Sequence, residues 1–137
     1  ATIVTFGTSS WVTGIVTTSL KTLIGRERAY GVQCRDNPLG QDCFSGYRNE
    51  SFPSGHASFA FTGAGLICSL RTPSSVLCPI GLGVAALTGV LRVAGNQHYL
   101  SDVVAGAAIG WVSGYYLPQW RSDERAVGYQ MSFALSP

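Results

Sequence analysis

The sequence predicts an all-α protein built as an antiparallel bundle of four helices. Three observations favour this class: long runs without charge, an apolar composition, and turns rich in glycine, proline and serine between the runs. Hydrophobic residues make up 46% of the 137 residues and charged residues 12%, against about a quarter charged in typical soluble domains. Four runs contain no charged residue, and His56 is the one histidine in them: 1–20, 51–70, 72–91 and 103–120.

The length of these runs bears on the environment of the bundle. Each is about as long as the hydrocarbon core of a bilayer requires, so we expect a membrane-embedded protein. The runs are also rich in Gly, Ser, Thr and Ala, which makes their hydropathy mild, and a soluble bundle of buried helices is the alternative. The net charge of +2 is too small to favour a nucleic-acid partner.

The first two helices flank a long polar segment. A helix is expected over residues 2–23, with Lys21 near its C-terminal end. Residues 24–52 contain several glycines and most of the charges, which is typical of a loop. The next helix is expected over residues 54–70 and carries His56 at its beginning.

Two further helices follow after short turns. One is expected over residues 76–93 and ends near Arg92. The other is expected over residues 97–117, with His98 and Asp102 in its first turns and Pro118 as its end. A short strand is expected near residues 129–135.

The four cysteines form two local pairs in the sequence. Neither Cys34 with Cys43 nor Cys68 with Cys78 has the spacing of a zinc site, so no structural metal is expected. A disulfide between Cys34 and Cys43 would fasten a polar loop and indicate an oxidising compartment. Four buried thiols are the alternative.

Helix direction decides where the polar residues lie. Short turns make neighbouring helices antiparallel, so the ends of the first and third helices should meet the starts of the second and fourth. Five polar residues should therefore gather at one end of the bundle: Lys21, His56, Arg92, His98 and Asp102.

Small residues recur at helical spacing from three of these positions, which indicates closely packed helices. They follow His56 at Ala60, Ala64 and Cys68, follow Asp102 at Gly106, Gly110 and Gly114, and precede Arg92 at Gly89, Ala85 and Gly81. Close packing along these stripes would bring the polar residues together.

This group of residues suits chemistry on an anion. His98 and Asp102 are four residues apart, so the carboxylate is expected to accept a hydrogen bond from one imidazole nitrogen and leave a lone pair on the other. Such a histidine is a better nucleophile or base. Three cations are expected around it, and cations in an apolar setting favour a bound anion. They are Lys21, Arg28 and Arg92.

The start of the second helix adds to the expected anion site. Ser54 is a helix-start residue, so the N–H groups of residues 54–56 should point toward an anion. Gly55 would let a phosphate-sized ligand approach the backbone closely. His56 is then free to protonate the leaving oxygen of a phosphoryl group.

Three sequence motifs resemble one family. They are Lys21 with Arg28, then Pro53-Ser54-Gly55-His56, then Arg92 with His98 and Asp102. Together they look like the three-part signature of the type 2 phosphatidic acid phosphatase family, which also includes glucose-6-phosphatase-like enzymes, bacterial nonspecific acid phosphatases and vanadium haloperoxidases. The first motif is weak alone, and the other two are specific in combination.

The chain departs from the family pattern in three ways. Ala29 stands where the family usually has proline, and Arg26 is a possible substitute for Arg28. Leu91 stands where the third motif usually has serine. Membrane members typically have six helices, so two N-terminal helices are expected to be absent, to lie in a part of the protein outside this sequence, or to be replaced by partner helices or subunits.

The resemblance implies a mechanism without metal or cofactor. His98 attacks phosphorus to form a phosphohistidine, with Asp102 orienting it. His56 protonates the leaving alcohol and then activates water. The oxygens are held by Lys21, Arg28, Arg92, the Ser54 hydroxyl and the Gly55 N–H. Residues 1–120 would be a helical phosphatase core with a catalytic loop at 21–53, and residues 121–137 a polar tail.

The resemblance leaves three functions open. A phosphatase acting on a phosphomonoester or pyrophosphate, with a lipid phosphate as the expected partner, is preferred. The alternatives are a vanadate-dependent haloperoxidase and a catalytically silent membrane or assembly subunit that retains the site.

The location of the site is also an expectation. We expect a cell membrane with the site on the periplasmic face, because Cys34 and Cys43 favour an oxidising side. Six basic residues near the site would favour the cytoplasm by the positive-inside rule. A second disulfide, between Cys68 and Cys78, would place both ends of the bundle outside the cytoplasm. It would favour a soluble periplasmic domain.

Overall fold

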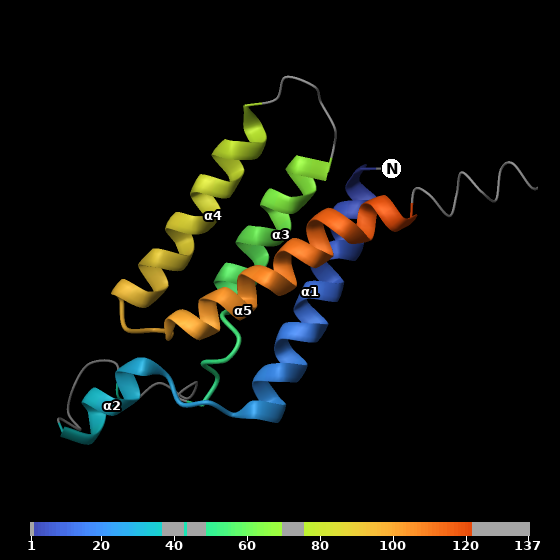
Figure 1. Cartoon of the computed structure of the whole chain (residues 1–137). Helices are drawn as coiled ribbons and strands as arrows, with labels where there is room; N and C mark the ends of the chain where they lie inside the picture. Colours follow the sequence, from blue (N-terminus) through green and yellow to red (C-terminus); the bar gives the residue numbers. More distant parts are fainter. Residues whose placement is uncertain (1, 37–42, 44–48, 70–75, 122–137) are drawn as a thin grey trace, which may run out of the picture.

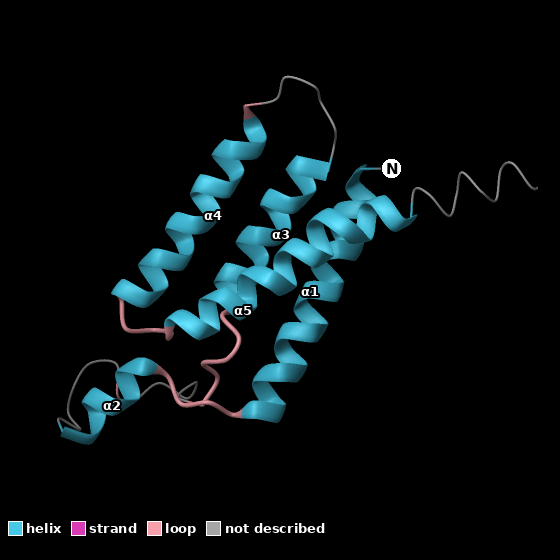
Figure 2. Ribbon diagram, viewed as in Figure 1, coloured by secondary structure: helices cyan, strands magenta, loops and turns pink. Residues whose placement is uncertain are grey.

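A computed structural model describes residues 2–36, 43, 49–69 and 76–121, and these form a bundle of helices (Figure 1). Within the described residues every regular element is helical, and the chain runs alternately down and up the bundle, as Figure 2 shows. The elements are α1 (Thr2–Ile24), α2 (Ala29–Asp36), α3 (Gly55–Ser69), α4 (Leu77–Ala94), α5 (Leu100–Trp111) and the π-helical turn η1 (Val112–Tyr116). The predicted all-α, antiparallel class is confirmed.

Helix α3 is the centre of the bundle, because α1, α4, α5 and η1 all pack against it. Its contact with α5 is unusually close. A Cβ atom added at Gly110 would lie 2.1 Å from the Ser58 carbonyl oxygen, and one at Gly114 would lie 2.1 Å from that of Thr62. Only glycine permits this approach of two backbones, so the stripe of glycines predicted for the last helix is confirmed along α5 and η1.

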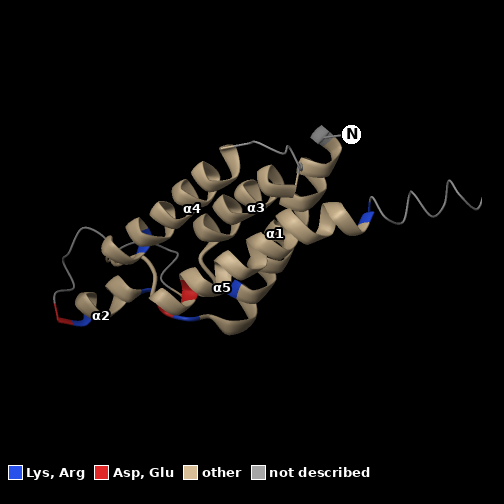
Figure 3. Cartoon of the chain, turned by 45° about the horizontal axis from the view of Figure 1, so that its top comes forward, with Lys and Arg blue, Asp and Glu red and all other residues tan. Residues whose placement is uncertain are grey.

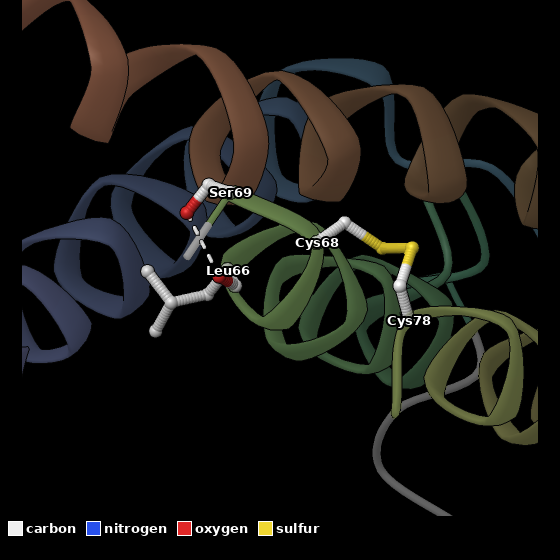
Figure 4. The surroundings of a disulfide bond; sticks show 4 residues. All are labelled: Leu66, Cys68, Ser69 and Cys78. Atoms are coloured by element: carbon white, nitrogen blue, oxygen red, sulfur yellow. Dashed lines mark hydrogen bonds between the residues drawn. A yellow bond between two sulfur atoms is a disulfide. The ribbon is translucent and has the colours of Figure 1, made fainter. Parts of the chain in front are cut away.

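The second face of α3 packs against α4. Ala64 of α3 lies against Gly81 of α4, and Ala85 of α4 is buried. One turn beyond Ala64, a disulfide joins Cys68 to Cys78, as Figure 4 shows. The stripes predicted on α3 and α4 therefore face each other. The α3 face toward α5 is a different one.

The interior of the bundle is small and polar, and its surface is apolar. Ser9, Thr13 and Thr62 are buried, and the hydroxyls of Thr13 and Thr62 share a hydrogen bond of 2.8 Å between α1 and α3. Trp11 is 75% exposed, and α4 presents a row of exposed Val and Leu residues. Small residues inside and large apolar residues outside are typical of helices packed within lipid.

Helix α4 is the one helix in the described part that is long and apolar enough to cross a membrane. Such a helix could also be the core of a soluble protein, but only 11% of this segment is buried in the structure. Of the four runs expected to span a membrane, one therefore meets this test among the described residues, which suggests a membrane only weakly.

Three boundaries differ from the sequence prediction. The loop 24–52 contains α2, which docks through the Tyr30 N–H on the Asn96 carbonyl at 2.8 Å. The last helix begins at Leu100 rather than near residue 97, so His98 precedes it. It continues through Pro118 to residue 121.

The π-helical turn explains how the helix passes Pro118. Proline lacks an N–H and clashes with the carbonyl four residues earlier, which normally ends a helix. Here η1 lies immediately before it, and the Leu117 N–H donates to the carbonyl of Val112, five residues back. The wider turn accommodates the proline. The predicted tail and strand lie almost entirely beyond the described residues.

Candidate active site

The predicted meeting of helix ends is observed. The ends of α1 and α4 and the starts of α3 and α5 lie at the same end of the bundle, next to α2 (Figure 1). Figure 3 shows that most of the charged residues gather there, while the body of the bundle is almost free of them. Charge and helix termini therefore coincide.

His98 is almost completely buried and is held by a backbone hydrogen bond. Its side chain is 2% exposed, and its Nδ1 lies 2.7 Å from the Ser51 carbonyl oxygen. A carbonyl oxygen only accepts hydrogen bonds, so Nδ1 carries the proton and donates it. The neutral ring then has its lone pair on Nε2.

The surroundings keep this ring neutral. Burial of the imidazole lowers the pKa of His98 to about 4, and the positive charge of Arg28 acts in the same direction. The hydrogen bond to Ser51 opposes the shift without cancelling it. At neutral pH His98 is therefore a free base, as a nucleophile must be.

Asp102 does not make the hydrogen bond that its spacing predicted. Its Oδ2 lies 3.8 Å from the His98 Nδ1, beyond hydrogen-bond distance. The same oxygen accepts from the Ser51 hydroxyl at 2.5 Å and from the Tyr99 N–H at 2.9 Å. The reason is the later start of α5: Asp102 lies in the first turn and bonds the helix N-terminus, while His98 lies outside the helix.

Arg26 completes the surroundings of Asp102. Its guanidinium donates to the Asp102 Oδ1 at 2.8 Å and lies 4.3 Å from the centre of the Tyr99 ring. The Asp102 side chain is fully buried, so this ion pair balances its charge. Arg26 is thus turned toward the carboxylate, which argues against its being the substitute for Arg28.

The three predicted cations act on the same small region. Arg28 donates to the side chain of Gln97 at 3.1 Å, beside His98. Lys21 donates to the Glu50 carbonyl at 2.5 Å, and burial followed by the charge of Arg28 lowers the pKa of Lys21.

The partly exposed His56 senses the same cations. Partial burial of its ring lowers the pKa of His56, and the charges of Arg92, Arg28 and Lys21 add to the effect in that order. These residues are therefore near neighbours, as the sequence predicted. A ring held among three positive charges favours an anion beside it.

At Ser54 the start of α3 offers an anion fewer donors than the sequence predicted. This residue is fully buried, and its N–H donates to the Asp102 carbonyl at 2.9 Å, so that N–H is not available to an anion. The N–H groups of Gly55 and His56 belong to the first turn of α3, where a helix supplies no acceptor. A Cβ added at Gly55 would make only ordinary contacts with Lys21 and Thr17. Packing therefore does not require glycine there.

Two residues of this region could not be found from the sequence in these roles. Ser51 and Arg26 come from the segment between α1 and α3, and their bonds to His98 and Asp102 join residues 47 to 76 positions apart. No local spacing signals such contacts.

The surface also carries grooves away from this site. One, of about 580 Å³, lies between α1 and α3 and is lined by Ser10, Trp11, Gly14, Ile15, Thr18, Ser19 and Phe59. Two others lie beside α1 and η1. None of the three contains a predicted site residue. Among the described residues, no group of three or more His, Cys, Asp or Glu is placed to hold a metal ion.

A helical bundle with two histidines and three cations at one end defines the class that the motifs indicate, the type 2 phosphatidic acid phosphatases and their relatives. Comparison with protein families agrees. The chain belongs to the PAP2 superfamily, whose family model matches residues 2–126.

Similar proteins include two curated relatives and one solved structure. The lipid A 1-phosphatase of Porphyromonas gingivalis is 32% identical over 116 residues, which cover 72% of this chain and 26% of the relative. Lipid phosphate phosphatase 2 of Arabidopsis thaliana is 31% identical over 125 residues, which cover 72% and 43%. The crystal structure of Aquifex aeolicus LpxE matches with a TM-score of 0.63 and 27% identity, covering 80% of this chain and 62% of that one.

The comparisons also show what share of each relative's length this chain covers. It spans less than half the length of the two curated relatives and less than two thirds of the LpxE chain. The shared part contains all three motifs, since the family match runs from residue 2 to residue 126.

Proposed function

We propose that the protein is a phosphatase that hydrolyses a phosphomonoester or pyrophosphate of a lipid through a phosphohistidine intermediate. The observation that carries the proposal is the state of His98, a buried neutral imidazole that donates from Nδ1 and has its lone pair on Nε2 among three cations. The names of the relatives, lipid A 1-phosphatase and lipid phosphate phosphatases, support a lipid phosphate as the substrate class.

In the first step the Nε2 of His98 attacks phosphorus, and the bond between phosphorus and the leaving oxygen breaks. The proton for that oxygen comes from His56, which must be protonated when substrate binds. A bound phosphate favours that form, because its negative charge opposes the cations that lower the pKa of His56.

In the second step the neutral His56 takes a proton from water, and the water oxygen attacks the phosphohistidine. The bond between phosphorus and the His98 nitrogen breaks, inorganic phosphate leaves, and both histidines return to their starting states. The buried Asp102 balances the positive charge that develops on His98 when its nitrogen bonds phosphorus.

The phosphoryl oxygens are held by cations and backbone donors. Lys21, Arg28 and Arg92 supply positive charge, and the Gly55 N–H adds a donor at the start of α3. The buried Ser54 holds the start of α3 against Asp102, so its proposed contribution is to place Gly55 and His56. Because the cations supply the charge, the reaction is proposed to need no added metal or cofactor.

We also propose that the bundle is embedded in a membrane with its site on the periplasmic face. The exposed apolar residues of α1 and α4 support the membrane. The disulfide between Cys34 and Cys43, close to the site, supports an oxidising compartment. The second disulfide, at the other end of the bundle, favours the alternative of a soluble periplasmic protein.

Phosphate release from a lipid phosphate, with a metal chelator present, tests the activity. The intact protein should release phosphate, and vanadate should inhibit it by occupying the anion site. His98→Ala should lower the rate by at least about a thousandfold, since removal of a catalytic nucleophile costs this much or more in other hydrolases. No release by the intact protein would favour a silent subunit, and halide oxidation with bound vanadate would favour a haloperoxidase.

A further inference from the structure

We propose that Ser51 is a positioning residue that connects Asp102 to His98, and this inference rests on the proposed role of His98 as nucleophile. Ser51 makes one contact with a carboxylate and one with an imidazole. The Ser51 carbonyl accepts from His98 at 2.7 Å, and the Ser51 hydroxyl donates to Asp102 at 2.5 Å. The direct distance from Asp102 to His98 is 3.8 Å, so the shortest hydrogen-bonded route between them passes through Ser51.

All three polar groups of Ser51 are engaged. Its N–H donates to the Arg26 carbonyl at 2.9 Å, in addition to the bonds made by its hydroxyl and its carbonyl. The residue is fully buried, so none of these bonds competes with water. The Ser51 carbonyl accepts the hydrogen bond from His98. Its orientation is therefore fixed by the bonds of the Ser51 N–H and hydroxyl.

The hydroxyl fastens a loop to a helix. Ser51 belongs to the segment before α3, whereas Asp102 belongs to the first turn of α5. Asp102 is itself held by Arg26 and by the Tyr99 N–H, so it is a fixed anchor. Through the hydroxyl, this anchor fixes the position of the Ser51 carbonyl, and the carbonyl fixes which imidazole nitrogen carries the proton.

The consequence for catalysis concerns which nitrogen of the His98 ring carries the proton. Attack on phosphorus needs the lone pair on Nε2, and that requires the proton on Nδ1. If the carbonyl moves away, the His98 ring loses its acceptor and part of the population places the proton on Nε2. That part cannot attack.

Three variants test this role, with a matched serine as control. Ser51→Ala and Ser51→Cys should lower kcat by about ten- to a hundredfold, as for other residues that orient a functional ligand, with KM little changed. Ser51→Thr, which keeps a hydroxyl, should recover most of kcat. Ser101 is the control, because its exposed hydroxyl also contacts Arg26 but has no bond to His98, and Ser101→Ala should leave kcat unchanged.

Nitrogen NMR of His98 provides a readout that does not depend on activity. The wild-type ring should show a protonated Nδ1 and an unprotonated Nε2, and Ser51→Ala should show a mixture of tautomers. A wild-type ring protonated on Nε2, or an unchanged tautomer and kcat in both Ser51→Ala and Ser51→Cys, would overturn the inference. A wild-type protein with the expected tautomer and no phosphate release would contradict the proposed function and leave the hydrogen-bond assignment intact.

Discussion

His98 owes its neutral charge and its tautomer to its surroundings rather than to a direct carboxylate partner. Burial and the charge of Arg28 keep the ring neutral, and the Ser51 carbonyl fixes its tautomer. In the proposed mechanism His56 carries a proton instead. It lies partly exposed beside cations that lower its pKa, and a bound anion would oppose that effect. Two histidines in different surroundings can thus serve as nucleophile and acid.

The pKa shifts of these two histidines predict an acidic optimum for kcat/KM. Activity should rise as the pH increases through about 4, because His98 must lose its proton. It should fall again as the pH rises through a second value that lies below 6.5, since His56 must keep its proton and its pKa is lowered from 6.5. The measurement is kcat/KM against pH with two substrates whose phosphate pKa values differ, so that substrate and enzyme limbs separate.

The same shift has a consequence for stability. Between about pH 6.5 and 4 the unfolded chain binds a proton at His98 that the folded chain does not, so the free energy of unfolding should fall as the pH decreases through this range. An enzyme limb for His98 at or above pH 6.5 would contradict the buried, neutral ring.

The sequence predicted which polar residues gather at one end of the bundle better than it predicted the contacts between them. Lys21, Arg92 and His56 could be placed because helix direction alone brings their ends of the bundle together. The partner of His98 could not, because the spacing to Asp102 implied one continuous helix. Tyr99 instead has extended backbone, with φ −78° and ψ 157°, and starts the helix after His98.

The glycines of α5 and η1 decide how closely this part of the chain approaches α3. Gly106, Gly110 and Gly114 face successive turns of α3, and the first of them lies beside the Ser54 carbonyl. The Ser54 N–H and the Asp102 carbonyl bond across the same contact. The packing of these helices therefore determines the geometry of the site, and a change in their spacing would move the site residues.

Replacement of Gly110 by alanine tests this coupling. The added Cβ would lie 2.1 Å from the Ser58 carbonyl oxygen, and a backbone atom cannot rotate away. We expect the free energy of unfolding to fall by about 1–3 kcal/mol or more, with a loss of activity, as measured by thermal unfolding and phosphate release.

Gly83→Ala is the matched control on α4, because a Cβ there meets nothing within 4 Å. It should be neutral or stabilise by up to about 1 kcal/mol. Equal stability of the two variants would show that the close contact of α3 with α5 is not required.

Elements with a periodic or punctuated sequence were predictable, and elements that depend on distant contacts were not. The ends of α1, α3 and α4 lie within about one residue of the predicted boundaries. Helix α2 was missed because its glycine and charges resemble a loop, whereas docking of Tyr30 on the turn before α5 stabilises it. Pro118 did not end the last helix, because η1 relieves its clash.

The whole molecule combines an apolar exterior with a charged end. Exposed Val and Leu residues cover α4, and charge gathers beside α2 (Figure 3). The two disulfides lie toward opposite ends of the bundle. If the bundle spanned a membrane and both ends reached water, one disulfide would be exposed to cytoplasmic reductants. Helix α3 has 15 residues, about 22 Å at 1.5 Å per residue, whereas a bilayer core is about 30 Å thick. Cys68 can therefore lie within the apolar layer, away from cytoplasmic reductants.

Membrane extraction together with thiol labelling tests this arrangement. The protein should stay in the membrane pellet after alkaline carbonate treatment, because its exposed apolar residues need lipid. After denaturation without a reductant, no cysteine should react with an alkylating reagent, since all four are paired. Release into the soluble fraction with both disulfides intact would favour the soluble periplasmic protein instead.

The central claim is that His98 carries the phosphoryl group during turnover. Rapid acid-free quenching of the protein with a lipid phosphate, followed by peptide mass spectrometry, measures this directly. We predict a phosphoryl group on His98 that is absent in His98→Ala. With an aryl phosphate, whose leaving group needs no proton from His56, it should accumulate in His56→Ala, where water is not activated. Steady phosphate release by His98→Ala, or a phosphoryl group on another residue of an active protein, would contradict it.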